Sequence, residues 1–228
     1  MADDFQIAPS KLGTKEYWDQ RYNTELDNFQ SFGDEGEIWF GASSENRMLK
    51  YICETSKTPT DAKILDIGCG NGSVLRKLRA NRFTNLMGID YCEAAVKLAR
   101  SLAEQETIQN SDIEGIIEFK QQDILHPDES IFDIKRDRVI DKGTWDAMSL
   151  SDPLNREARL NKYKEFLRRS LNDNGEFIIF SCNFTIDELR RQFDGDFLAF
   201  VKEIPASHQF SFGGKPGVTS TGAVFVRK

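Results

Sequence analysis

The strongest constraint on the fold is an alternation of short apolar runs with helical patterns, which begins at Lys63. Between the apolar runs, residues that repeat three and four positions apart predict amphipathic helices. Strands that alternate with helices form βαβ units, which build a mainly parallel sheet covered by helices on both faces. We therefore expect an α/β fold, a Rossmann-like doubly wound sheet of seven strands. The predicted strands are 63–67, 85–90, 116–123, 137–143, 176–182, 197–204 and 223–228, and the helices that alternate with them are 73–80, 93–106, 156–171 and 186–193.

The two ends of the chain depart from this alternation. The last two predicted strands are joined by a connection that contains glycines and no helical pattern. A parallel crossover usually needs a helix, so we expect an antiparallel pair at the sheet edge. The other expectations are an irregular start over 1–13, a helix starting over 15–22, an acidic loop over 27–37, a helix over 46–54 and a turn over 172–175.

A glycine-rich loop follows the first predicted strand. Residues 64–72 read ILDIGCGNG and place Gly68, Gly70 and Gly72 at the carboxyl end of that strand. Ligands of open α/β sheets bind at this edge. Glycines would let backbone N–H groups approach a ligand closely, and the next helix presents its positive end there. The loop predicts a nucleotide-like ligand with a polar or anionic tail.

The spacing within this loop distinguishes between ligands. A dinucleotide fingerprint would need a third glycine where this chain has Ser73, and Asp66 would face a pyrophosphate poorly. An acid at position 66 suits an ammonium, and S-adenosylmethionine carries an ammonium and a carboxylate on its methionine end. The string Asp-x-Gly-x-Gly-x-Gly resembles the first motif of class I S-adenosylmethionine-dependent methyltransferases. In this resemblance Cys69 and Asn71 of the loop also contact the cofactor.

Two further acids end the second and third predicted strands. Asp90 closes the second strand, where a carboxylate can accept both ribose hydroxyls, and Tyr91 beside it would pack on the adenosine. Asp123 closes the third strand. In the methyltransferase family an acid at this place accepts the adenine amino group, and the next backbone amide, here that of Ile124, meets the ring.

The fourth predicted strand ends in VIDKGTWDA, residues 139–147. In class I methyltransferases this end lies beside the reactive methyl group. The Asn/Asp-Pro-Pro-aromatic motif of amino-adenine and glutamine methyltransferases is absent, which argues against those substrates. Asp141 ends an apolar run, and we expect it at the mouth of the pocket.

Several segments narrow the resemblance to one family. IWFG (38–41), DKGT (141–144), SCN (181–183) and FSFGG (210–214) stand in the same order as in the group of enzymes that methylate a lysine of translation elongation factor 1-alpha. The similarity runs from Leu12 to the C-terminus. It implies an N-terminal extension with a helix over 1–35 and a methyltransferase domain over 36–228.

For methyl transfer to lysine, we hypothesise three catalytic residues. Asp141, which would also contact the cofactor, would receive the lysine ammonium, Asn183 would orient the amine, and Trp39 would wall the channel. Aromatic side chains can hold a cationic product. The further candidates for such walls are Phe40, Trp145, Phe184, Phe210 and Phe212.

Composition limits the partners and the compartment. A net charge of −7 disfavours binding to a nucleic-acid backbone. Cysteines without CxxC spacing, few histidines and an N-terminus without an apolar core point to a cytoplasmic protein without a bound metal. We also expect a monomer without membrane attachment.

Two other functions stay open at this point. A small-molecule O- or N-methyltransferase of the same fold usually closes its pocket with a helical lid, and the segment before the glycine loop looks too short and acidic to provide one. A non-catalytic cofactor-binding module has no need for the three acids Asp66, Asp90 and Asp123.

Overall fold

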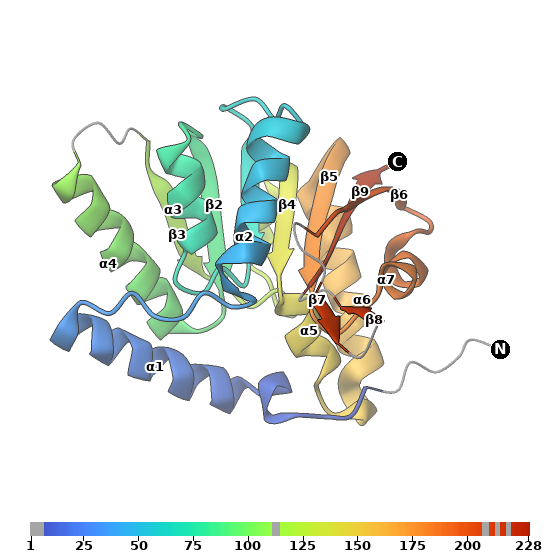
Figure 1. Ribbon diagram of the computed structural model, residues 1–228, viewed down its shortest axis with the longest axis horizontal. Helices are drawn as coiled ribbons and strands as arrows, with labels where there is room; N and C mark the ends of the chain where they lie inside the picture. The colour runs from blue at the N-terminus through green and yellow to red at the C-terminus, as the bar shows by residue number, and fades with distance from the viewer. Residues whose placement is uncertain (1–6, 111–114, 207–209, 213–214, 218–219) are drawn as a thin grey trace.

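The computed structural model describes residues 7–110, 115–206, 210–212, 215–217 and 220–228. A seven-stranded sheet lies at its centre in the order β3-β2-β1-β4-β5-β9-β6, with helices on both faces (Figure 1). The strands of this sheet are β1 (Lys63–Ile67), β2 (Asn85–Asp90), β3 (Ile117–Gln121), β4 (Arg136–Lys142), β5 (Leu171–Ser181), β6 (Leu198–Ile204) and β9 (Thr221–Arg227). The helices of eight or more residues are α1 (Lys15–Phe32), α2 (Gly41–Lys50), α3 (Ser73–Ala80), α4 (Glu93–Gln109), α6 (Pro153–Ser170) and α7 (Ile186–Phe193).

The topology confirms the doubly wound sheet. Strand β1 pairs in parallel with β2 on one side and with β4 on the other, so the chain winds outward in both directions from β1. Ligands of such sheets bind at this switch point, beyond the carboxyl ends of the strands. The fold therefore directs attention to the ends of β1, β2 and β4.

The expected antiparallel pair is also confirmed. Strand β9 runs antiparallel to both β5 and β6. Strand β9 lies between β5 and β6, so the strand that runs opposite to the others is the second from the edge. Strand β6 is the edge strand. A second, two-stranded sheet pairs β7 (Phe210–Phe212) with β8 (Lys215–Gly217).

Each face of the sheet has its own apolar core. On one face Leu65 and Ile67 of β1 pack with Phe166 of α6, Leu189 of α7 and Trp145. The short helix α5 (Thr144–Ser149) supplies that tryptophan. On the other face Ile64 packs with Met48 of α2 and Leu75 of α3. This division follows the alternation of side chains along a strand that is buried on both sides.

Helix α1 differs from the expected structure of the N-terminal region. It crosses the carboxyl ends of the parallel strands (Figure 1) and continues to Phe32, so the loop expected over 27–37 is wrong in its first part. Leu26 and Phe29 continue the apolar stripe of Tyr22 at helical spacing and pack with it in a small cluster on α4. Gly33 ends the helix with φ 73°, and its N–H bonds the Phe29 carbonyl at 2.8 Å.

Two smaller findings complete the fold. The turn expected over 172–175 is an irregularity inside β5, where the register shifts between Arg136 and Arg138 and Asn174 has φ 62°. In the described part of the chain, every helix is too short or too polar to cross a membrane.

Candidate active site

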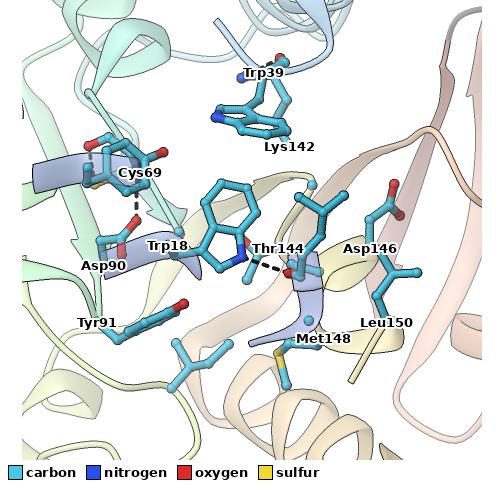
Figure 2. A pocket seen from close by; sticks show the side chains of 18 of the residues that line it. Trp18, Trp39, Cys69, Asp90, Tyr91, Lys142, Thr144, Asp146, Met148 and Leu150 are labelled. Atoms are coloured by element: carbon cyan, nitrogen blue, oxygen red, sulfur yellow. Dashed lines mark hydrogen bonds between the residues drawn. The ribbon is translucent and has the colours of Figure 1, made fainter. Parts of the chain in front are cut away.

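A cavity of about 260 Å³ opens at the carboxyl ends of β1, β2 and β4. Figure 2 shows Trp18 of α1 in its middle, with Cys69, Asp90 and Tyr91 on one side and Thr144 and Asp146 on the other. Among the residues expected from the sequence, the cavity is lined by Trp39, Phe40, Gly68, Cys69, Gly70, Asn71, Asp90, Tyr91, Asp123, Ile124 and Asn183. Asp66, Gly72, Asp141, Trp145 and Phe184 are not part of this lining.

The glycine loop lies at the carboxyl end of β1, as the sequence predicted, and its backbone N–H groups are bonded within the protein. Gly68, Gly70 and Gly72 all have positive φ angles. The N–H groups of Gly68 and Cys69 bond the Ile89 carbonyl, and the Gly70 N–H bonds Asp90 Oδ2 at 3.1 Å. The N–H groups of Gly72 and Ser73 are also bonded within the loop, so all five of these amides already have an acceptor inside the protein. These bonds hold the loop rigidly against β2.

Close neighbours explain why the loop needs glycine. A Cβ on Gly68 would lie 1.9 Å from Thr144 Oγ1, and one on Gly70 would lie 2.3 Å from the Tyr22 hydroxyl oxygen. A Cβ on Gly72 would meet Phe119 at 2.6 Å. The first two glycines therefore keep the cavity open. The third lets α3 pack on the sheet, which corrects the expectation that Gly72 faces the ligand.

Asp90 lies where the sequence predicted, as a buried carboxylate in the cavity wall (Figure 2). It accepts hydrogen bonds from the N–H groups of Gly70 at 3.1 Å and Cys92 at 2.9 Å. Burial raises the pKa of Asp90 to about 6, and the two backbone bonds oppose that rise. A carboxylate has about four acceptor positions, so this one can still accept hydroxyl groups from a ligand.

The residues that follow β3 also line the cavity. Asp123 is exposed to 44% in its side chain, and its carboxylate accepts from Leu125 N at 2.8 Å and His126 Nδ1 at 3.0 Å. It therefore holds its own turn as well as lining the cavity. Buried Ile124 and half-buried Tyr91 give this end an apolar surface suited to a flat ring.

Asp66 lies behind the glycine loop, outside the cavity lining. Burial raises the pKa of Asp66, and the charge of Lys142 acts against that rise. Lys142 itself donates to the Trp39 carbonyl at 2.9 Å and lies 3.9 Å from Glu45 Oε2. The expected contact of Asp66 with a ligand ammonium is therefore corrected: in this structure Asp66 belongs to a buried charge cluster beneath the loop.

Asp141 is likewise fully buried, at 0% exposure, and does not reach the pocket mouth. Its oxygens accept from Thr144 N at 2.8 Å, Trp145 N at 2.9 Å and the Tyr163 hydroxyl at 2.5 Å. Burial raises its pKa to about 7 against these three bonds. The expectation that Asp141 receives a substrate ammonium is wrong, because the carboxylate faces the start of α5 and Tyr163 of α6 rather than the cavity.

Asp146 takes the place in the cavity that Asp141 was expected to hold, and sequence reasoning missed it. Its carboxylate accepts from the Ser181 hydroxyl at 2.5 Å, Cys182 N at 2.7 Å and Asn183 N at 3.2 Å. Burial raises the pKa of Asp146 to about 6. The bonds join the DKGTWD and SCN segments and fix the backbone of Asn183, which is one of the residues that line the cavity. The sequence signal that could have revealed Asp146 is its position, five residues after Asp141 on the short helix α5.

The aromatic candidates separate into two groups. Trp39 and Phe40 line the cavity, and Trp39 packs edge-on against Trp18 with ring centres 4.7 Å apart. Trp145 and Phe184 are buried in the core and pack against each other, with ring centres 6.1 Å apart. The expectation that they wall a channel is therefore wrong. The side chains of Phe210 and Phe212 lie outside the described residues.

Helix α1 acts as a cover over the cavity, which the sequence analysis did not expect. Trp18 and Tyr22 line the cavity from this helix, and Leu12 and Gly13 line it from the turn before α1. A Cβ on Gly13 would lie 2.3 Å from the Leu150 backbone, so the turn sits directly on the end of α5. A helical lid is therefore present, and its supposed absence cannot argue against a small-molecule enzyme.

The comparisons with known proteins agree with this geometry. Residues 59–209 match the model of a methyltransferase domain family. The chain is 42% identical to EEF1A lysine methyltransferase 2 of Mus musculus, over 100% of this chain and 87% of that protein. It is 38% identical to protein-lysine N-methyltransferase EFM4 of Saccharomyces cerevisiae, over 97% of both chains.

A solved structure extends the comparison of the fold. The N-methyltransferase NodS of Bradyrhizobium japonicum in complex with S-adenosyl-L-homocysteine superposes with a TM-score of 0.62 at 15% identity, over 92% of this chain and 98% of that one. This likeness concerns the fold.

Proposed function

The chain belongs to the methyltransferase domain family and, within it, to the protein-lysine methyltransferases that include EEF1A lysine methyltransferase 2, and we propose that it methylates a lysine of translation elongation factor 1-alpha. It is an S-adenosylmethionine-dependent protein-lysine N-methyltransferase. The observation that carries this function is the identity of 36–42% to enzymes of that name over nearly the whole chain.

The residues around the cavity fit S-adenosylmethionine. Asp90 has acceptor capacity for ribose hydroxyls, and Tyr91 and Ile124 offer apolar surface for an adenine ring, with Asp123 at its edge. Gly68 and Gly70 leave room for the methionine end, because side chains there would collide with Thr144 and Tyr22. When bound, this cofactor supplies an electrophilic methyl group on a sulfonium.

The protein's own part is to position a neutral lysine amine. A lysine with a reference pKa of about 10.4 is mostly protonated at neutral pH, so it must lose a proton before it can attack. Desolvation beside the aromatic surfaces of Trp39 and Phe40 favours the neutral amine. Near-attack alignment is worth about 7–11 kcal/mol in favourable systems, so orientation can supply much of the rate.

Asn183 is the residue we propose for that orientation. It lines the cavity, and its backbone N–H is bonded to Asp146. An amide oxygen accepts a hydrogen bond from an amine without charging it. Asp146 acts as a positioning residue here, because its carboxylate holds the Asn183 N–H at 3.2 Å and the Cys182 N–H at 2.7 Å. As further parts of the proposal, the enzyme works as a monomer in the cytoplasm.

Methyl transfer to purified elongation factor 1-alpha tests the proposal. The purified chain is incubated with the factor and labelled S-adenosylmethionine, and intact mass counts the methyl groups added. Gly70→Arg is the control, since even a Cβ there would lie 2.3 Å from the Tyr22 hydroxyl. Label on the factor that disappears in the control supports the function. An unlabelled factor, with label in small molecules of a cell extract, would indicate a small-molecule enzyme.

A further inference from the structure

The turn that leads into α2 has a backbone conformation that its side chains disfavour. The Gly41 N–H bonds the Ile38 carbonyl at 2.8 Å, so Trp39 and Phe40 are the two central residues of a β-turn. Phe40 has φ 66° and ψ 5°, whereas Trp39 does not have a positive φ. These angles are those of a type II turn, in which glycine usually occupies the position of Phe40. A larger residue in this conformation costs free energy and persists only where neighbouring groups hold it.

One of these neighbouring groups is the bare backbone at the start of α5. A Cβ on Gly143 would lie 2.9 Å from Phe40 Cζ, so the ring of Phe40 lies directly on this glycine. Gly143 itself has φ 105° and is the N-cap residue of α5. This contact seats the ring of Phe40, and a second group holds the backbone of the turn.

The second group is the ammonium of Lys142 at the end of β4 (Figure 2). It donates to the Trp39 carbonyl at 2.9 Å, and this carbonyl belongs to the central peptide of the turn. The two common turn types differ by a flip of that peptide, and a type I turn accepts phenylalanine at the position of Phe40. A flip would turn the Trp39 carbonyl away from Lys142. The hydrogen bond therefore favours the type II turn over the type I turn that the side chains alone prefer.

The carboxylates around Lys142 support this bond rather than replace it. Glu45 Oε2 lies 3.9 Å from Lys142 Nζ, which is beyond hydrogen-bond distance. Glu45 Oε1 already accepts from Lys77 at 2.6 Å and from the Ser73 hydroxyl at 2.8 Å. Burial lowers the pKa of Lys142, and the charges of Glu45 and Asp66 act against that fall. They favour the charged ammonium, whose hydrogen-bond partner is the Trp39 carbonyl.

We infer that Lys142 is a positioning residue for methyl transfer: by holding the Trp39 carbonyl it keeps the turn in its type II form, and so it sets the aromatic wall beside which the substrate lysine is placed. Trp39, Phe40 and Lys142 all line the cavity, so a flipped turn would rearrange this wall. The inference rests on the proposed function, in which the two aromatic residues desolvate the substrate amine. It predicts that Lys142 affects turnover and leaves the adenosine side of the cavity unchanged.

Kinetics with elongation factor 1-alpha and titration calorimetry with S-adenosylhomocysteine test this role together. Lys142→Met removes the ammonium and keeps most of the stem, and Lys142→Arg keeps a cationic donor. Lys77→Met is the matched control, because it removes a lysine that bonds the same Glu45 from outside the cavity lining. Misplaced reacting groups slow a reaction strongly, so Lys142→Met should lower kcat by about tenfold to a hundredfold.

The other measurements separate positioning from a loss of folded protein. Affinity of Lys142→Met for S-adenosylhomocysteine should stay within about twofold of wild type, and the binding stoichiometry gives the fraction of folded sites. Lys142→Arg should recover part of the rate, and Lys77→Met should keep the wild-type kcat. Unchanged turnover in Lys142→Met, or a loss that the folded fraction or cofactor affinity fully explains, would overturn the inference.

Nuclear magnetic resonance tests the turn itself without any substrate. A short distance from the Trp39 Hα to the Phe40 N–H proton marks a type II turn, and a short distance between the two N–H protons marks type I. Wild type should show the first contact, and Lys142→Met should gain the second. A type II turn that persists in Lys142→Met would also overturn the inference. A wild-type chain that leaves the elongation factor unmethylated would contradict the proposed function, whereas a methylating wild type with a fully active Lys142→Met variant would contradict this inference alone.

Discussion

Asp90 and Asp141 occupy equivalent places in the two halves of the sheet, since each ends or nearly ends a parallel strand beside β1. Both are buried and both have a raised pKa. Asp90 faces the cavity because a bend at Tyr91 and Cys92 separates β2 from α4. Asp141 is followed after two residues by α5, whose first amides take its carboxylate. The element that follows a strand thus decides whether a terminal acid serves the ligand or the fold.

Removing Asp141 should have the largest effect, and it should be on stability. Asp141→Ala leaves two N–H groups and the Tyr163 hydroxyl without their acceptor at a site with 0% exposure. Each orphaned buried donor costs about 1–3 kcal/mol, so we expect a loss of about 3–5 kcal/mol in the free energy of unfolding. Urea denaturation measures it. Tyr163→Phe, which removes one of the three bonds, should lose less, and a loss below about 1 kcal/mol in Asp141→Ala would contradict the assigned role.

The pH dependence of stability provides a second test of the structural role of Asp141. Burial raises the pKa of Asp141 to about 7, against the Tyr163 hydroxyl and two amides and with the charge of Asp146 adding to the rise. An unfolded aspartate titrates near 3.9, so between these values the native state holds a proton that the unfolded state has lost. The contribution of Asp141 is complete below about pH 4 and is lost as the pH rises through 7.

Comparison with Asp141→Asn isolates that contribution. Wild-type stability should fall relative to the variant by about 1 kcal/mol per pH unit between pH 4 and 7. Asp90 titrates in the same direction, but it is common to both proteins and cancels in the difference. Parallel stability curves for the two proteins would mean that Asp141 does not titrate in this range.

Replacing Asp90 should weaken cofactor binding more than it destabilises the fold, the reverse of what we expect for Asp141. Asp90→Asn keeps an acceptor for one backbone amide but removes the charge and half of the acceptor capacity that face the cavity. Hydrogen bonds to charged groups are worth about 1.5–3 kcal/mol, so affinity for S-adenosylhomocysteine should fall about tenfold to a hundredfold. Titration calorimetry beside urea denaturation separates the two effects. A large loss of stability with unchanged affinity would make Asp90 resemble Asp141.

Local patterns predicted the regular elements well and the lid poorly. The strands 63–67 and 85–90 and the helices 73–80 and 186–193 have the predicted bounds, because apolar periodicity and punctuating residues lie within each segment. The 27–37 segment was predicted as a loop from its acids, although Leu26 and Phe29 continue a helical stripe. Where α1 packs depends on distant α4 and α5, which no local pattern encodes.

The site was predictable in its location but not in the direction of each side chain. Three successive strands were expected to end in acids, and the cavity lies at those ends. Asp66 and Asp141 are at the right ends but lie outside the cavity lining. The charge of Lys142 acts on Asp66, and Asp141 accepts from the Tyr163 hydroxyl. Whether a carboxylate faces a ligand depends on which donors the surrounding elements offer, and for Asp141 those donors come from α5 and α6. Tyr22 and Asp146 were missed for the same reason.

Asp123 completes the comparison with the smallest expected effect. Its side chain is 44% exposed, and both carboxylate oxygens already accept from Leu125 and His126 of its own turn. Solvent replaces much of what a ligand bond would contribute there, so Asp123→Asn should weaken S-adenosylhomocysteine by only about twofold to fivefold. His126→Ala is the matched control, because it removes one partner of the carboxylate and leaves the carboxylate itself. If Asp123→Asn lost as much affinity as Asp90→Asn, burial would not be what separates these two strand-end acids, and a direct bond to the cofactor would have to hold Asp123 despite its exposure.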